Sequence, residues 1–329
     1  MIVAKINLKY PEEFPMPQSH TITRQFMGLF SLFGLALLLI LTPQPSQAQD
    51  EYTAYWDGQT RFTVLIMGMD RRPSEHNTLQ VRTDAIMIAS YDPATQQLGI
   101  LSIPRDMHFS LVENGELARV NTLVLRGENI QEGYGPIYAM DTLQYNFGFY
   151  IDAYMLFDFE AFITVVDAIG GITIDVPLAI YDQEFPDMDY GFDPFEVERG
   201  VQDFDGYDAL RYARTRHGDN DYLRGQRQLA VLEAIYAKLQ QPDTLNGVID
   251  DIPSLLDQLS NNFYTNIAIE DGVRLGIELA NLTFDDVHTG ALNQAYSLQV
   301  NQGRETSRVP DRALLPELLI EVFGENYSG

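Results

Sequence analysis

The sequence lacks cysteine entirely, and this absence excludes disulfide bonds and thiolate metal sites. Lysine is scarce as well: beyond residue 9, the chain of 329 residues contains only Lys238, so almost all positive charge is guanidinium. Acidic residues dominate, with 47 Asp+Glu against 21 Lys+Arg and a formal net charge of -26. Such a chain has no broad basic surface that could displace counterions, so we expect no nucleic-acid partner.

Long hydrophobic runs are also missing. The uncharged run Phe26–Leu41 would span about 24 Å as a helix, which is less than the ~30 Å hydrocarbon core of a bilayer. Basic residues precede it, and the small residues Ser46 and Ala48 follow it at a spacing that a signal peptidase accepts. Residues 1–49 therefore indicate a signal peptide or a signal-anchor, which places the rest of the chain outside the cytoplasmic membrane, anchored or released.

The rest of the chain has the pattern of a folded protein. Hydrophobic residues make up 45% of the sequence and charged residues 21%, as in ordinary globular domains. We expect one α/β domain with a mixed, largely antiparallel central sheet that is sandwiched by helices. Residues 50–245 would form its core, and residues 246–329 would complete the same domain.

Three early runs that are rich in Ile and Val predict β-strands. They cover residues 61–69, 84–91 and 97–103. The short turn "DPATQQ" makes the second and third runs an antiparallel hairpin. If the first strand is also antiparallel to the second, Asp70, Asp84 and Arg105 lie at the same edge of the sheet.

Further elements are expected downstream. Helical patterns cover residues 135–148 and 158–171, and a strand pattern covers 171–177. Residues 181–206 are acidic and aromatic and contain Pro and Gly, so we expect an elaborated loop. A helix should follow the arginine-rich stretch and end near Gln241.

The aromatic stretch 145–162, "YNFGFYIDAYMLFDFEAF", has two interpretations. Its Phe and Tyr side chains fit ordinary core packing, and they equally fit the lining of an apolar channel for a lipid chain.

The arginines gather in "RYARTRHGDNDYLRGQRQ", residues 211–228. On the helix that begins there, Arg224 shares a stripe with Val231 and Ile235, so its side chain should point toward the protein. A buried guanidinium needs an anion, which nearby carboxylates supply only in part. Phosphate or pyrophosphate matches several guanidinium forks. The predicted anion ligands are Arg82, Arg105, Arg214, Arg216, Arg224 and Arg227.

Asp70 and Asp84 stand beside these arginines, and hard carboxylates next to phosphate ligands indicate Mg²⁺. Taken singly, each aspartate would better suit a turn or a strand end, and their convergence with Arg105 at one edge of the sheet is what favours the metal. Asp84 is also the candidate for orienting or deprotonating an attacking hydroxyl, although this role and metal ligation compete for the same oxygens.

Several motifs resemble those of one family, the LytR-CpsA-Psr phosphotransferases of bacterial cell envelopes. The matching segments are "VLIMGMDRR", "VRTDAIMIASYDP", "LGILSIPRDM", "RVNTLV", "VVDAIGGITIDVP" and "DGYDALRYARTRHGDNDYLRGQRQ". They extend from about Phe62 to Gln240. The resemblance implies a Mg²⁺-dependent transferase that moves a glycopolymer from a polyprenyl-pyrophosphate carrier to peptidoglycan or another envelope acceptor through a phosphodiester.

The resemblance also implies roles for individual residues. Asp70 and Asp84 match the acidic residues near Mg²⁺, and Asp221 matches a supporting aspartate. Gln228 and Arg119, the latter at a position where many members have lysine, are expected to join the pyrophosphate ligands. The residues that match pyrophosphate ligands are Arg105, Arg214, Arg216 and Arg224. The catalytic roles would fall on Asp84, Arg105 and Arg224.

Two other functions remain open from the sequence. The same site could hydrolyse pyrophosphate with water, which would require no acceptor pocket. A non-catalytic envelope module could hold an anionic glycan, although Asp70 and Asp84 would repel a polyanion unless a metal lay between them.

Overall fold

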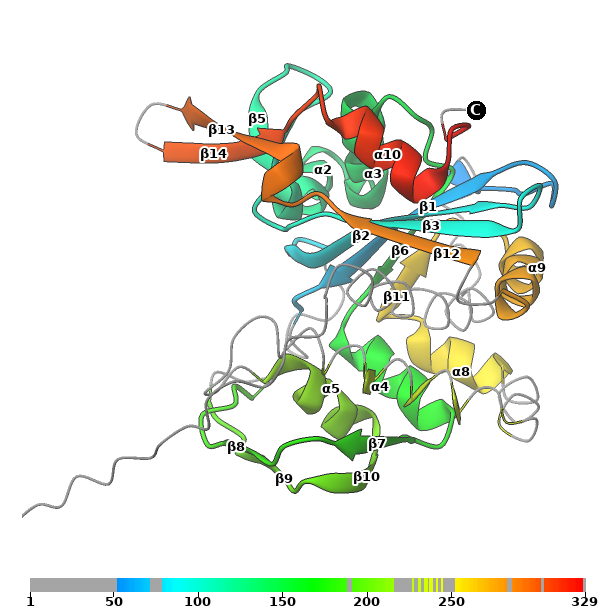
Figure 1. The fold of residues 1–329 in the computed structure, drawn as a ribbon, viewed down its shortest axis with the longest axis vertical. Coiled ribbons are helices and arrows are strands. Elements are labelled where there is room, and N and C mark those ends of the chain that lie inside the picture. The colour runs from blue at the N-terminus through cyan, green and yellow to red at the C-terminus, as the bar shows by residue number, and fades with distance from the viewer. Residues whose placement is uncertain are drawn as a thin grey trace, which may run out of the picture.

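The computed structural model describes residues 52–71, 79–187, 191–215, 252–282, 286–302 and 305–327, together with scattered positions between 227 and 244. At its centre is a six-stranded sheet in the order β11-β6-β1-β2-β3-β12 (Figure 1). Its strands are β1 (Phe62–Met69), β2 (Thr83–Asp92), β3 (Gln97–Ser102), β6 (Ala153–Phe157), β11 (Phe263–Thr265) and β12 (Val287–Ala291).

The sheet is mixed and largely antiparallel, as the sequence predicted. Strand β2 pairs antiparallel with both β1 and β3, and β11 pairs antiparallel with β6. Strand β6 runs parallel to β1, and β12 runs parallel to β3. Parallel strands need long connections, and between the members of each pair the chain runs through helices and further strands.

Strand β1 is apolar throughout because both of its faces are covered. Val64 and Ile66 belong to one core cluster, whereas Leu65 and Met67 belong to the other. Successive side chains of a strand point to opposite faces, so the two clusters lie on opposite sides of the sheet.

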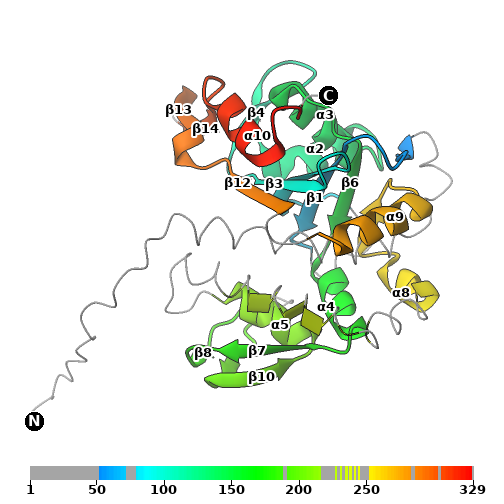
Figure 2. The ribbon, with the colours of Figure 1, turned by 45° about the vertical axis from the view of Figure 1, so that its right-hand side comes forward.

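Helices cover both faces, which confirms the predicted sandwich (Figures 1 and 2). One face carries α2 (Leu123–Ile130), α3 (Gly135–Phe147) and α10 (Leu315–Phe323). The other core cluster includes α4 (Phe159–Ala168), α5 (Gly206–Arg214), α8 (Ile252–Leu259) and α9 (Ile269–Ala280).

Helix α4 shows how local sequence sets an element's ends. Asp158 caps its N-terminus by accepting a hydrogen bond from the Ala161 amide at 3.0 Å. After the helix, Gly170 and Gly171 adopt φ values of 77° and 73°. A Cβ at Gly171 would lie 2.7 Å from the Phe204 carbonyl oxygen, so glycine is required there.

Small two-stranded sheets surround this body. They are β4 (His108–Ser110) with β5 (Leu117–Arg119), β7 (Ile172–Val176) with β10 (Gly200–Phe204), β8 (Ile180–Asp182) with β9 (Phe195–Val197), and β13 (Ser297–Gln302) with β14 (Glu305–Pro310). Short 3-10 helices cover Val120–Thr122 (η3) and Gln294–Tyr296 (η5).

The expectation of a loop over residues 181–206 was wrong in part, because β8, β9 and β10 lie largely within it. Phe185, Phe195 and Phe204 are buried in the core and anchor this segment. Its strands are short and interrupted by Pro and Gly, so their periodicity was too weak to predict them.

The C-terminal segment builds into the same sheet. Strands β11 and β12 form its two edges, and α10 packs closely on β3 and β12. The close approach depends on two glycines: a Cβ at Gly99 would lie 2.3 Å from the Val322 carbonyl oxygen, and one at Gly290 would lie 2.4 Å from Val322 Cγ2.

Part of the aromatic stretch 145–162 is buried as core packing requires, and its use as the lining of a lipid channel stays a prediction. Phe147, Phe149 and Tyr154 are buried in the cluster beneath α10, and the Phe149 and Phe323 rings lie 5.7 Å apart. Tyr145 and Tyr150 are instead exposed.

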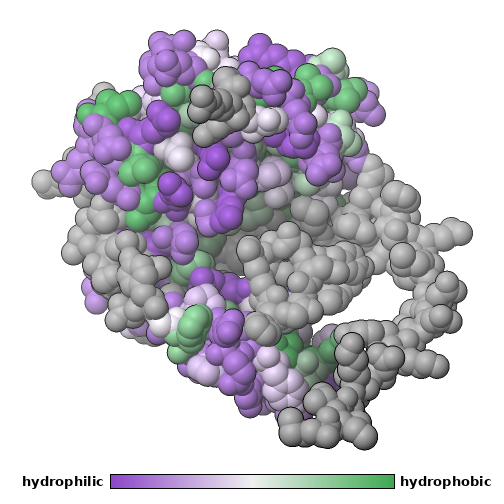
Figure 3. Space-filling model, turned by 90° about the vertical axis from the view of Figure 1, so that its left-hand side faces the viewer, coloured by the Kyte–Doolittle hydropathy of each residue, from purple (hydrophilic) through white to green (hydrophobic). Residues whose placement is uncertain are grey.

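The described surface seen in Figure 3 is mostly hydrophilic, with hydrophobic residues scattered between, as the acidic composition leads one to expect. The apolar run Phe26–Leu41 lies outside the described residues. In the part of the chain that the structure describes, no helix combines the length and the apolar character needed to cross a bilayer.

Candidate functional site

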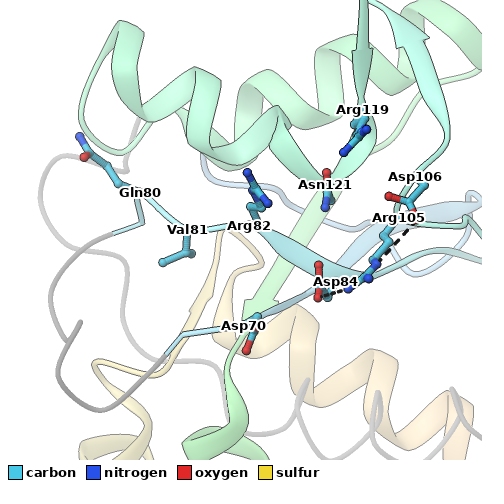
Figure 4. A pocket seen from close by; sticks show the side chains of 9 residues that line it. All are labelled: Asp70, Gln80, Val81, Arg82, Asp84, Arg105, Asp106, Arg119 and Asn121. Carbon is cyan, nitrogen blue, oxygen red and sulfur yellow. Dashed lines mark hydrogen bonds and ion pairs between the residues drawn. The ribbon is translucent and has the colours of Figure 1, made fainter. Parts of the chain in front are cut away.

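Three consecutive strands bring the predicted acidic and basic residues to one edge of the sheet. Met69 pairs with Thr83 at the end of β1, and the Asp70 amide donates to the Arg82 carbonyl at 3.1 Å. A pocket of about 450 Å³ opens at this edge (Figure 4). Its lining residues are Asp70, Gln80, Val81, Arg82, Asp84, Arg105, Asp106, Arg119 and Asn121.

Asp84 and Arg105 form an ion pair in this pocket (Figure 4). Arg105 Nη1 donates to Asp84 Oδ2 at 2.5 Å, while its Nε lies 3.9 Å from Asp106 Oδ2. Side-chain exposures are 46% for Arg105 and 32% for Asp84, so water screens the pair and it adds little to folding stability. Either partner can therefore exchange the other for a ligand at small cost.

Arg82 and Arg119 come from separate elements and line the same pocket. Arg82 directly precedes β2, and Arg119 ends β5. Both side chains are exposed, and in the view of Figure 4 they stand on either side of Asn121. The lining holds three arginines and three aspartates, so the described pocket is formally neutral and would need further positive charge to hold a pyrophosphate.

Asn121 is a pocket residue that the sequence reasoning missed. It is only 6% exposed, and its main-chain N–H donates to the Arg105 carbonyl at 3.4 Å. Its buried Oδ1 has no hydrogen-bond partner among the described residues. The signal was present in "RVNTLV", where Asn121 follows Arg119 by two residues, but a lone asparagine indicates no chemistry by itself.

The pair Asp70 and Asp84 suits Mg²⁺ only together with further oxygen ligands. Within the described ranges, no group of three or more acidic or histidine side chains is placed to hold a metal ion. Two carboxylates suffice for Mg²⁺ when waters and substrate phosphate oxygens complete its octahedron. The donors therefore suit an ion that arrives with its phosphate ligand.

Arg71, the residue after Asp70, holds this edge in place. It is buried and donates from Nε to Asp158 Oδ2 at 2.9 Å and from Nη1 to the Tyr264 hydroxyl at 3.2 Å. Burial opposes its charge, but Tyr264 and the Asp158 carboxylate outweigh burial and raise the pKa of Arg71. This contact ties the end of β1 to α4 and β11.

Arg214 does not line the pocket of Asp70 and Asp84. It ends α5, and its guanidinium carbon lies 4.1 Å from the centroid of the Phe159 ring and 5.7 Å from that of Phe185. A cation over aromatic faces at the C-terminus of a helix is favourable in its own right. Its role as a pyrophosphate ligand stays a prediction.

Arg227 has an environment different from the one predicted. It is 7% exposed, and it donates from Nε to the Tyr212 carbonyl at 3.1 Å and from Nη2 to the Thr215 carbonyl at 2.5 Å. These bonds reach main-chain oxygens at the end of α5, where the last helical carbonyls have no partner within the helix. These contacts support a structural role, and binding of pyrophosphate by Arg227 stays a prediction.

The other predicted members of the cluster, Arg216, Asp221, Arg224 and Gln228, lie outside the described residues. Farther along the same helical stripe, Val231 and Ile235 are buried at 1% and 3% exposure. The apolar part of the stripe therefore faces the core, as the spacing predicted.

Comparison with known proteins extends this picture. The model of the LytR_cpsA_psr family matches residues 42–311. The chain belongs to the LytR_cpsA_psr family. An uncharacterized protein of Staphylococcus aureus is 29% identical over 213 residues, which cover 64% of this chain and 50% of that protein.

A second relative is TagT of Bacillus subtilis, a polyisoprenyl-teichoic acid–peptidoglycan teichoic acid transferase. It is 28% identical to this chain over 219 residues. The match covers 66% of this chain and 64% of TagT. The chain thus spans between 50% and 64% of the length of these two relatives.

A solved structure described as TagT bound to LIIa-WTA has the same fold, with a TM-score of 0.58 and 23% identity. The superposition covers 85% of this chain and 99% of that one.

Proposed function

We propose that the chain is an extracytoplasmic phosphotransferase. It moves a glycopolymer from a polyprenyl-pyrophosphate carrier to a cell-wall acceptor, peptidoglycan above all, through a phosphodiester. The observation that carries this proposal is one pocket in which Asp70 and Asp84 meet Arg82, Arg105 and Arg119. The name of the relative TagT, a polyisoprenyl-teichoic acid–peptidoglycan teichoic acid transferase, supports the same substrate classes.

The arginines bind the non-bridging oxygens of the pyrophosphate. Arg105 already lies 2.5 Å from a carboxylate oxygen of Asp84, and a phosphate oxygen offers the same acceptor geometry. As Arg105 moves to the phosphate, Asp84 gains a free oxygen. Guanidinium groups that meet charge as it develops lower the barrier to phosphoryl transfer.

The proposed transfer forms one phosphorus–oxygen bond and breaks another. An acceptor oxygen forms a bond to the phosphorus nearer the glycan, and the bond from this phosphorus to the bridging oxygen breaks. The lipid phosphate leaves with the bridging oxygen and its electron pair. The hydroxyl proton passes to the Asp84 carboxylate, whose exposed position permits such contact.

Asp70 and Asp84 would hold Mg²⁺ together with the substrate. The ion would neutralise phosphate oxygens, which supplies the positive charge that the formally neutral lining lacks. Arg216 and Arg224, which follow Arg214 in the sequence, would add to it.

The location of the protein follows from residues 1–49, which we propose to act as a signal peptide or a signal-anchor. The catalytic pocket then works at the outer face of the cytoplasmic membrane, where a lipid-linked substrate is held in the bilayer and its polar end reaches the protein.

A transfer assay tests the proposal. The full chain in detergent is mixed with a synthetic short-chain prenyl-pyrophosphate oligosaccharide and cell-wall fragments, and the covalent conjugate is measured by mass spectrometry. Asp84→Asn and Arg105→Ala should each lower the rate at least ~100-fold. Arg312→Ala, at an exposed arginine outside the pocket, is the matched control.

The products separate the alternative functions. Release of free oligosaccharide phosphate without conjugate would mean hydrolysis and would overturn transfer. Binding of the substrate without any turnover, unchanged or tighter in Asp84→Asn, would identify a non-catalytic module.

A further inference from the structure

A second pocket lies beside the other ends of strands β1 and β6, away from the pocket of Asp70 and Asp84. Asp152 directly precedes β6, which runs parallel to β1, whereas Asp70 directly follows β1. Asp152 lies level with Thr63, seven residues before Asp70, so about 23 Å separates them at ~3.3 Å per residue. This second pocket measures about 640 Å³. It is lined by Tyr52, Thr53, Ala54, Tyr55, Tyr134, Ile137, Met140, Asp141, Gln144, Tyr150, Ile151, Asp152 and Asn266.

Its lining differs in charge and side-chain type from that of the first pocket. Four tyrosines from three separate segments line it, and Tyr55 and Tyr150 are 74% and 71% exposed. Asp141 and Asp152 add two carboxylates, and the lining contains no Lys, Arg or His among the described residues. An anion such as pyrophosphate would be repelled here.

Hydrogen bonds hold the carboxylates and the wall in place. Asp152 Oδ2 accepts from the Thr63 amide at 2.7 Å, and Asp141 Oδ2 accepts from the Tyr134 hydroxyl at 3.1 Å. Asn266 Nδ2 donates to the Tyr52 carbonyl at 2.7 Å, which fixes the first described residues against the body. A pocket whose polar groups are fixed beforehand binds its ligand at a lower entropic cost.

We infer that this pocket binds a saccharide whose exposed groups are hydroxyl or protonated amino groups. Carboxylate oxygens only accept hydrogen bonds, so the ligand must bring the donors. Exposed tyrosine faces pack against the apolar face of a sugar ring and attract a cationic amine. The inference goes beyond the proposed function, because no residue of the first pocket takes part.

Exposed tyrosines also occur where proteins meet membrane surfaces. The charge of the pocket argues against that partner here. Asp141 and Asp152 have no cation beside them in the described lining, and an anionic lipid surface would repel them. The donors of a sugar satisfy the same carboxylates directly.

Calorimetry on the full chain in detergent tests the inference with two probes, a neutral chito-oligosaccharide and its deacetylated, cationic counterpart. We expect both to bind. Tyr55→Ala and Tyr150→Ala should each weaken binding at least ~10-fold, whereas Tyr150→Phe, which keeps the ring, should stay within about threefold. Tyr181→Ala, at a tyrosine of β8 that is 56% exposed, is the matched control.

Asp152→Asn probes the charge. It should reduce the preference for the cationic probe and leave affinity for the neutral one within about threefold. The neutral probe is decisive because a chain with a formal net charge of -26 attracts cations non-specifically, so binding of the cationic probe alone would not identify a site.

Lack of binding by the neutral probe, or binding that Tyr55→Ala and Tyr150→Ala leave unchanged, would overturn the inference. So would tyrosine-dependent binding to phosphatidylglycerol vesicles in the absence of sugar binding. Asp84→Asn should not affect these titrations, so failure of the transfer reaction and failure of this site are separate results.

Discussion

At the scale of single residues, the Asp84–Arg105 pair and the Arg71–Asp158 pair have opposite roles. The first is exposed, contributes little to stability and can exchange partners. The second is buried at 0% and 2% side-chain exposure, so removing one partner would leave an uncompensated charge. The first pair can meet a ligand, and the second fixes the end of β1 beside it.

Asp152 illustrates how burial couples to pH. Burial raises the pKa of Asp152 from 3.8 to about 6, although the Thr63 amide works in the opposite direction. The folded protein therefore disfavours the charged form more than the unfolded chain does. This group's contribution to stability is greatest below pH 3.8 and falls as pH rises toward about 6.

We therefore expect Asp152→Asn to melt about 2–4 °C higher than the wild type at pH 7.5, with the difference closing near pH 4. Thermal unfolding followed by circular dichroism measures both values. Because removing any negative charge relieves repulsion in so acidic a chain, Asp175→Asn, at an exposed carboxylate of β7, gauges that general effect. A difference that persists unchanged at pH 4 would contradict the role of burial.

Single residues also mark how far the sequence could predict the site. Asp70, Asp84 and Arg105 were predictable because three consecutive strands set their positions. The contacts of Arg227 were not, because its partners are main-chain carbonyls of Tyr212 and Thr215, which leave no trace in a residue pattern.

At the scale of elements, the packing of α10 depends on two strand positions that have no side chain. Gly99 and Gly290 leave room for the Val322 main chain and side chain, respectively. A Cβ at either position overlaps its neighbour. The two cases differ because substitution can shorten the Val322 side chain, which faces Gly290, but cannot remove its carbonyl group, which faces Gly99.

Gly290→Ala should accordingly destabilise the protein by about 1–3 kcal/mol through overpacking. Val322→Ala removes the atom that the new Cβ would meet at 2.4 Å. In urea unfolding, the double variant should lose less stability than the sum of the two single losses. Strictly additive losses would show that α10 does not rest on Gly290.

Elements with strong periodicity were predicted well, and those without it were not. Strands β1 to β3 and helices α3 and α4 fall where their patterns placed them. Strands β8 and β9 have only three residues each, and their stability comes from buried anchors such as Phe185 and Phe195. Short alternation in an acidic segment cannot be told from a loop.

At the scale of the whole molecule, charge is the dominant feature. A formal net charge of -26 places like charges close together in the folded state, and this repulsion weakens folding at low ionic strength. The first pocket works against this field when it binds an anion, and the second pocket works with it when it binds an amine.

We expect the melting temperature to rise when NaCl is increased from about 10 mM to about 150 mM, since the Debye length falls from ~30 Å to ~8 Å. Differential scanning calorimetry at pH 7.5 measures this shift. Glucose at equal osmolality is the control for non-ionic effects. A melting temperature that falls with added NaCl would mean that attractive ion pairs outweigh the net repulsion.

The sequence by itself determined the fold class, the hairpin geometry and the meeting of Asp70, Asp84 and Arg105, because hydrophobic periodicity and short turns act between near neighbours. Only the tertiary structure decided that Asn121 joins the first pocket, that Arg227 binds the main chain, and that Tyr55, Tyr150 and Asp152 share a second pocket. These contacts join segments up to a hundred residues apart. Their geometry depends on how the layers pack, and no local pattern records it.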